Sequence, residues 1–153
     1  MRKDEYMDMY YVIGAAMRVH EILGRGLEEP VYQEALSIEF ERRNLKAVAQ
    51  YPIDCYYDGV KMEKKYFADF YFNGIVIELK SVEKICSEHR AQLFNYMRLT
   101  HTKRGLLINF AGKSLYSERY LYSEFDDDFI LLTEDNYKDY VTIDPHPILP
   151  SNS

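Results

Sequence analysis

Three ionisable side chains, Asp69, Glu78 and Lys80, flank an Asn73-Gly74 dipeptide in an otherwise largely apolar run, residues 66–80. Asn-Gly is a strong signal for a two-residue β-hairpin turn, and with that turn Asp69 falls directly opposite Glu78. Because side chains alternate between the two faces of a strand, Asp69, Glu78 and Lys80 then share one face of the hairpin. The other face is apolar and is predicted to be a core face; it carries Ala68, Phe70, Phe72, Ile75, Ile77 and Leu79.

Two carboxylates at opposite positions of a strand pair have Cβ atoms ~4.5–5.5 Å apart, and like charges at that separation are destabilising. A hard cation such as Mg²⁺ would relieve the repulsion, because it takes oxygen ligands. Lys80 could hold an attacking water or stabilise the pentavalent phosphate of a transition state. The pattern therefore predicts a divalent-metal site that hydrolyses a phosphodiester bond. The alternative is a solvent-exposed Asp–Glu–Lys cluster on a sheet edge, and a β-bulge would shift the register on which the prediction depends.

Two pairs of side chains at helical spacing could add to this site. Glu29 and Tyr32 lie three residues apart at the start of a predicted helix. Gln92 and Tyr96 lie four apart on one face of another, with His89 one turn earlier on that face. Taken singly, such pairs are more often surface and core-edge residues than parts of a site, so their value lies in the combination.

In their order along the chain, these residues resemble the motifs of the PD-(D/E)XK nuclease superfamily. The Asp and the Glu-x-Lys of that superfamily correspond to Asp69 and to Glu78-Leu79-Lys80. Members related to helicase-associated nucleases add a Gln-x-x-x-Tyr helix, here Gln92 to Tyr96. Ala68 stands where the superfamily's name has Pro, a position that carries no ligand.

More closely, the chain resembles the small bacterial GxxExxY proteins of that superfamily, through the run Gly26-Leu27-Glu28-Glu29-Pro30-Val31-Tyr32. The resemblance extends over about residues 9–121 and leaves the acidic C-terminal part outside it. It implies an α/β fold with a restriction-endonuclease-like core, in which helices flank a central mixed β-sheet.

The resemblance also implies a cofactor and site roles. Mg²⁺ or Mn²⁺ would be held by Asp69, Glu78 and the Leu79 backbone carbonyl, with Glu29 as a further or water-mediated ligand. The residues that would orient the site or contact the nucleic-acid backbone are Gln92, Tyr96, Tyr32 and His89.

The implied function is a metal-dependent nuclease, with DNA as the expected substrate. The alternative is a nucleic-acid-binding or regulatory module that keeps the nuclease fold with little or no cleavage. A third reading is an interaction domain whose 15 tyrosines meet a protein partner. No recognition element longer than the core is visible, so specificity would come from a protein partner or from a homo-oligomer.

Hydrophobic periodicity and turn residues predict the elements that must position these side chains. Helices are expected over residues 9–23, 30–44 and 87–99. Strands are expected within residues 45–72, with a turn at Asp58-Gly59, and at 75–80, 105–110 and, as an edge strand, 119–122.

Composition and charge limit the remaining possibilities. No apolar run reaches the ~20 residues of a membrane span, and two cysteines without metal-ligand spacing predict reduced thiols in a cytoplasmic protein. Residues 1–116 hold 17 Lys or Arg and 16 Asp or Glu, whereas residues 117–153 hold 2 and 9. We therefore expect a nuclease-like domain over residues 1–122 and an acidic C-terminal extension over residues 123–153.

Overall fold

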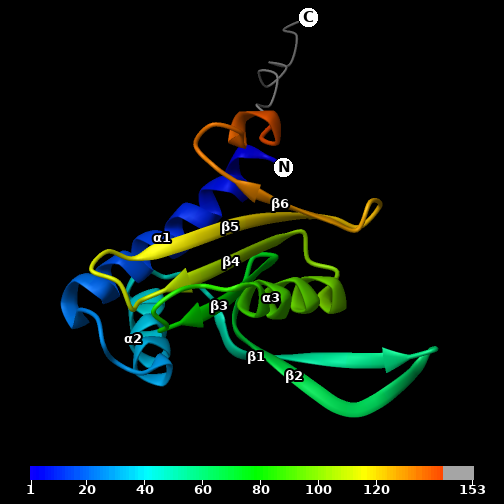
Figure 1. The fold of residues 1–153 in the computed structure, drawn as a ribbon, viewed down its shortest axis with the longest axis horizontal. Helices are drawn as coiled ribbons and strands as arrows, with labels where there is room; N and C mark the ends of the chain where they lie inside the picture. Colours follow the sequence, from blue (N-terminus) through cyan, green and yellow to red (C-terminus); the bar gives the residue numbers. More distant parts are fainter. Residues whose placement is uncertain (143–153) are drawn as a thin grey trace, which may run out of the picture.

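The computed structural model describes residues 1–142 and contains one six-stranded sheet with helices on both faces (Figure 1). The strands follow one another in sequence order, and all neighbours are antiparallel except β3 and β4, which are parallel. This mixed sheet confirms the predicted α/β fold with a restriction-endonuclease-like core. The elements are α1 (Lys3–Leu23), α2 (Glu29–Arg42), β1 (Val48–Tyr57), β2 (Val60–Phe72), β3 (Ile75–Lys80), α3 (Ser87–Thr100), β4 (Arg104–Asn109), β5 (Tyr116–Ser123), β6 (Asp128–Leu132) and the short 3-10 helix η1 (Tyr137–Asp139).

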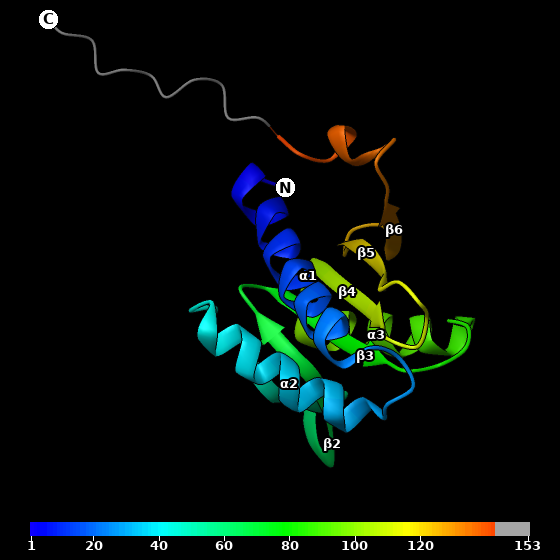
Figure 2. The ribbon, with the colours of Figure 1, turned by 90° about the vertical axis from the view of Figure 1, so that its left-hand side faces the viewer.

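The sheet divides the hydrophobic core into two clusters, each covered by helices. Helices α1 and α2 cover one face of the sheet, and α3 covers the other (Figure 2). Helix α1 ends where predicted, at Leu23, and the Gly24 that follows has a φ of 70°, which glycine readily adopts. Helix α2 has Pro30 in its first turn, where the missing N–H costs no hydrogen bond. Strands β3 and β4 lie between both layers and are almost wholly buried.

Both predicted hairpin turns are confirmed. The two central residues of each turn, Asp58-Gly59 and Asn73-Gly74, have positive φ, as type I′ turns require. The second turn is also held from outside, because the buried guanidinium of Arg104 donates to the Asn73 carbonyl. The same side chain donates to the Glu5 carbonyl of α1 at 2.6 Å, so one residue ties the turn to the first helix.

The strand expected at the sheet edge, within β5, is an inner strand, and that prediction was wrong. β5 lies between β4 and β6, and Tyr120 of β5 pairs with Leu131 of β6. The C-terminal extension predicted from residue 123 onward therefore begins with a strand of the same sheet. Leu132 of that strand packs into the core beside α1, and residues 143–153 lie outside the described part of the chain.

Within the described residues, the helices include no candidate membrane span and the two cysteines form no disulfide bond. Among residues 1–142, no helix is both long and apolar enough to cross a membrane. Cys55 is buried in β1 and Cys86 lies just before α3; both are free thiols.

A buried carboxylate connects the sheet to α3. Glu118 of β5 is 3% exposed and accepts two hydrogen bonds from Arg90, both at 2.8 Å. It also accepts hydrogen bonds from the hydroxyls of Tyr116 and Tyr120. Burial alone would raise the pKa of Glu118, but these four donors outweigh it and hold the pKa at about 2.

We predict that Glu118→Gln destabilises the protein at pH 7 by about 2 kcal/mol, because Arg90 loses its partner but stays partly exposed. The pKa of Glu118 is lowered on folding, so its contribution is present above pH 4.5 and is lost as the pH falls towards 2. Urea unfolding at several pH values measures this. A variant whose deficit relative to wild type stayed constant from pH 7 to pH 2 would contradict it.

Candidate metal centre

Strands β2 and β3, which carry the predicted site, stop pairing with each other at that site. The register of β2 and β3 runs from Phe72–Ile75 to Phe70–Ile77 and ends there. At the next position Asp69 lies across from Glu78, as predicted, but side chains take over the hydrogen bonds. The Asp69 N–H donates to the Glu78 carboxylate at 3.0 Å, and the Leu79 N–H donates to the Asp69 carboxylate at 2.8 Å.

The two carboxyl groups are buried next to each other. Glu78 is 3% exposed, and its burial, followed by repulsion from Asp69, raises its pKa to about 9. Burial is also the main cause that raises the pKa of Asp69. The nearby charge of Lys80 lowers both pKa values but does not cancel these shifts. The positive charge of Lys80 is therefore too weak to offset the burial and mutual repulsion of the two carboxyl groups.

The strict alternation of faces predicted for β2 fails at Ala68. Ala68 is buried, but it packs in the cluster under α3 and not with Phe70 and Phe72 under α1 and α2. The change of face falls at Asp69, where β2 leaves β3. Gln50, which lies across from Asp69 in β1, has a φ of 50°, so β1 is distorted at the same level.

The Leu79 carbonyl points to the same edge of β3 as the Leu79 N–H, which donates to Asp69. In a strand the N–H and C=O of one residue point to the same edge. Since the Leu79 N–H points to Asp69, its carbonyl also points into the gap that opens between β2 and β3. Within the described residues, β2 offers Leu79 no ladder partner.

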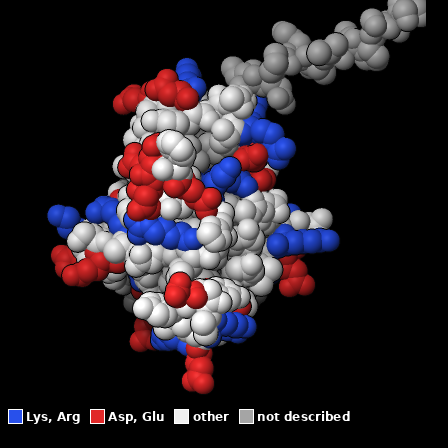
Figure 3. Space-filling model, turned by 90° about the vertical axis from the view of Figure 1, so that its right-hand side faces the viewer, with Lys and Arg blue, Asp and Glu red and all other residues white. Residues whose placement is uncertain are grey.

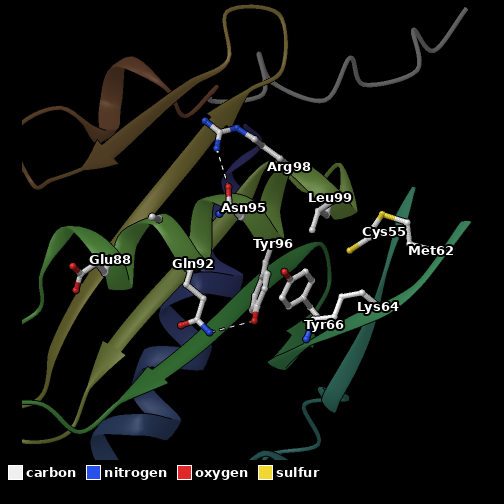
Figure 4. A pocket seen from close by; sticks show the side chains of 11 residues that line it. Cys55, Met62, Lys64, Tyr66, Glu88, Gln92, Asn95, Tyr96, Arg98 and Leu99 are labelled. Carbon is white, nitrogen blue, oxygen red and sulfur yellow. Dashed lines mark hydrogen bonds between the residues drawn. The ribbon is translucent and has the colours of Figure 1, made fainter. Parts of the chain in front are cut away.

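Lys80, Gln92 and Tyr96 form a chain of hydrogen bonds beside the carboxylates. The Lys80 ammonium donates to the Gln92 side-chain oxygen at 2.8 Å. The Gln92 amide in turn donates to the Tyr96 hydroxyl at 3.2 Å, the bond drawn in Figure 4. The charges of Glu78 and Asp69 add to burial in raising the pKa of Tyr96, so this ring lies close to both. The structure thus brings together five residues from three elements, β2, β3 and α3.

Glu29 lies in the first turn of α2, within electrostatic reach of Asp69. Its charge contributes to the raised pKa of Asp69, after burial. It is not part of a closed ligand cluster: within residues 1–142 no group of three or more His, Cys, Asp or Glu side chains is close enough to hold a metal ion. The oxygen donors gathered here are two carboxylates and a main-chain carbonyl.

Tyr32 is placed to organise a loop. Its ring is fully buried and stacks on Phe110 at 4.4 Å. Its hydroxyl donates to the Gly24 carbonyl at 2.7 Å and accepts from the Leu27 N–H at 3.2 Å. The tyrosine therefore shapes the loop that leads into Glu29.

His89 is engaged at the start of α3. Its Nδ1 accepts a hydrogen bond from the Cys86 N–H at 3.1 Å and lies 3.4 Å from the Cys86 sulfur. These contacts cap the helix that carries Gln92 and Tyr96. Of the residues expected to orient the site, Tyr32 thus holds the loop before α2 and His89 caps the start of α3.

Two supporting residues were missed in the sequence. The Ser81 hydroxyl donates to the Leu27 carbonyl at 2.7 Å and joins the Tyr32 loop to the end of β3. Asn109 makes a pair of hydrogen bonds with the main chain of Val82 and holds the segment that follows Lys80. A buried amide at the end of an apolar strand was a signal for the second; nothing distinguishes the serine.

The arrangement combines oxygen donors for a hard cation with a lysine held beside them. Such a site can bind a divalent ion and stabilise negative charge on a phosphate. The nucleophile of a hydrolysis would be water, because no Ser, Cys or His side chain joins the described hydrogen-bond network at the carboxylates.

Comparison with known proteins identifies the family of this chain. The family model of the PD-(D/E)XK nuclease superfamily matches residues 7–120. One solved structure, "Crystal structure of SSO0001", is similar at a TM-score of 0.47 and 21% identity, covering 59% of this chain and 48% of that one. The chain thus spans about half the length of that protein. No curated protein sequence matches. Since the family match covers most of the sequence, the chain belongs to the PD-(D/E)XK nuclease superfamily.

Proposed function

We propose that this protein is a divalent-metal-dependent nuclease that hydrolyses phosphodiester bonds in DNA. The observation that carries the proposal is the buried pair of Asp69 and Glu78, with Lys80 held beside it by Gln92. Two adjacent carboxyl groups with raised pKa values are an unfavourable arrangement for a site with no ligand. A cation between them removes the repulsion.

The donor set suits Mg²⁺ or Mn²⁺. Both prefer carboxylate and carbonyl oxygens, which here come from Asp69, Glu78 and Leu79. Glu29 would act through a water molecule, since it lies near Asp69 without joining a ligand cluster. When bound, the ion supplies a water of lowered pKa and a counter-charge for the phosphate.

Lys80 would bind the scissile phosphate or the attacking water. Its ammonium has three donors, of which one bonds to Gln92, so two remain to be directed at oxygen atoms. Gln92 in turn is fixed by Tyr96. This chain limits the positions that the ammonium can take, which favours a defined transition-state geometry.

The GxxExxY resemblance adds a role for the Tyr32 loop. That loop sets the start of α2 and with it Glu29, through the two hydrogen bonds of the Tyr32 hydroxyl. We propose that the chain belongs to this smaller group, because residues 26–32 carry its motif. Sequence preference would come from a second copy of the chain or from a protein partner, since residues 1–142 form little beyond the core sheet and its helices.

We predict that Asp69→Asn and Lys80→Ala each lower DNA cleavage in Mg²⁺ or Mn²⁺ by at least a hundredfold, because each removes a charge that acts on the phosphate or its ion. The measurement is the initial rate of cleavage of labelled single- and double-stranded DNA by purified protein. Lys138→Ala is the matched control, because Lys138 is exposed on η1, beyond the far side of β6.

Wild-type turnover by Lys80→Ala would refute the assigned role of this lysine. A folded wild-type protein that binds DNA tightly but cuts none of the substrates with either metal would instead favour the nucleic-acid-binding module considered from the sequence.

A second prediction concerns the metal-free protein. The pKa of Glu78 is about 9 in the folded state and 4.5 ordinarily, so this residue's contribution to stability is full below pH 4.5 and is lost as the pH rises towards 9. Glu78→Gln keeps an oxygen acceptor and cannot ionise. At pH 8 in EDTA we therefore expect the variant to be more stable than wild type by about 2 kcal/mol.

Thermal unfolding from pH 5 to pH 9, with and without Mg²⁺, tests this. Mg²⁺ should stabilise wild type and have little effect on Glu78→Gln, and Glu83→Gln, an exposed carboxylate, should behave as wild type. If Mg²⁺ raised the melting temperature of Glu78→Gln as much as that of wild type, Glu78 would not be a ligand.

A further inference from the structure

A cleft of about 670 Å³ opens beside the candidate metal centre, between the β1–β2 hairpin and α3. Figure 4 shows Tyr66 and Lys64 of β2 on one side and Gln92 and Tyr96 of α3 on the other. The last two also belong to the hydrogen-bond chain from Lys80. A ligand that contacts Gln92 in the cleft is therefore one hydrogen bond away from the proposed catalytic lysine.

The cleft exists because β2 leaves β3 at Asp69. Beyond that point the β1–β2 hairpin extends away from the sheet as an arm (Figure 1). Its tip exposes large apolar side chains, with Tyr57 at 76% and Val60 at 68%. Such exposure, continuous with a lined cleft, is typical of a binding surface.

The lining combines aromatic rings with a lysine that has no acidic partner. Tyr66 is 39% exposed, and its ring centre lies 5.7 Å from that of Tyr96 at a 44° tilt. The Lys64 ammonium lies 5.0 Å from the centre of the Tyr66 ring. The neighbouring lysines, Lys61 and Lys65, both contact Asp54, whereas Lys64 makes no salt bridge within residues 1–142.

The surface around the arm is not a strong phosphate-binding face. Figure 3, which views the molecule from the side of the arm's tip, shows basic and acidic side chains interspersed around neutral areas. Residues 1–116 carry nearly equal numbers of each. Duplex DNA buries its bases and is bound mainly through its phosphates, so it would use little of an aromatic lining. Unstacked bases, in contrast, can stack on the aromatic side chains of the cleft.

We infer that this cleft binds the unstacked bases of single-stranded nucleic acid next to the scissile phosphate, with a base stacked on Tyr66 and Lys64 on the neighbouring phosphate. The inference rests on the proposed nuclease function and names its substrate class. DNA and RNA share the chemistry that the cleft recognises, namely flat bases on a charged backbone.

The test is the affinity of the full chain in EDTA for fluorescent oligo-dT, for oligo-U of equal length and for a DNA duplex. We expect single strands to bind more tightly than the duplex, and Tyr66→Ala to weaken single-strand binding about tenfold with little effect on the duplex. Tyr66→Phe, which keeps the ring, should bind as wild type. Tyr11→Ala, an exposed tyrosine on α1, is the control.

A second pair of variants keeps the test decisive if Tyr66→Ala folds poorly. Met62 lines the cleft and is 46% exposed; Met62→Glu should repel the backbone and weaken binding. Met17→Glu, at a position 58% exposed on α1, should not. Equal or tighter binding of the duplex, or single-strand binding unchanged in both cleft variants, would overturn the inference. Oligo-dU, measured beside oligo-U, differs from it in the sugar alone, and the ratio of their affinities assigns the sugar.

The two proposals can fail separately, because binding is measured without metal and cleavage with it. If the protein cuts duplex DNA with metal and the cleft variants bind single strands as wild type does, the nuclease proposal holds and the single-strand inference is wrong. Tight single-strand binding through Tyr66 without cleavage by wild type would do the reverse.

Discussion

The separation of β2 from β3 at Asp69 is the feature on which the site depends. A regular hairpin would have continued its ladder and held the two carboxylates opposite each other on a continuous sheet. Here the Glu78 carboxylate accepts a hydrogen bond from the Asp69 N–H, and the Asp69 carboxylate accepts one from the Leu79 N–H, so both carboxylates are fixed by the backbone. The same divergence turns the Leu79 carbonyl into the gap and frees the hairpin arm that forms the wall of the cleft.

Keeping two acids buried in this way requires a rigid surrounding. The Asn73-Gly74 turn, held by Arg104 against α1, limits how far β3 can shift relative to β2. On the other side, α3 is anchored to β5 through Arg90 and Glu118 and presents Gln92 to Lys80. The pair is thus repulsive locally but stable in the fold, since the packing around it resists the movement that would relieve it.

Residues that share a motif do not share a role. In the GxxExxY run, Glu29 lies near the carboxylate pair, whereas Tyr32 is in the core with its hydroxyl holding the preceding loop. In α3, Gln92 and Tyr96 reach the site, but His89, one turn earlier, caps the helix. Spacing along a helix shows which residues share a face. Which of those residues reach the site depends on where the helix crosses the sheet.

The sequence alone determined the turns, the long helices, strands β1 to β5 and the position of Asp69 across from Glu78, because Asn-Gly geometry and hydrophobic periodicity are local properties. It did not predict that Ala68 changes faces, that β5 is an inner strand, or that Ser81 and Asn109 hold the loops. Those features depend on where β2 diverges and on β6 adding to the sheet. Only tertiary structure decided them, since they arise from contacts between segments that are distant in sequence.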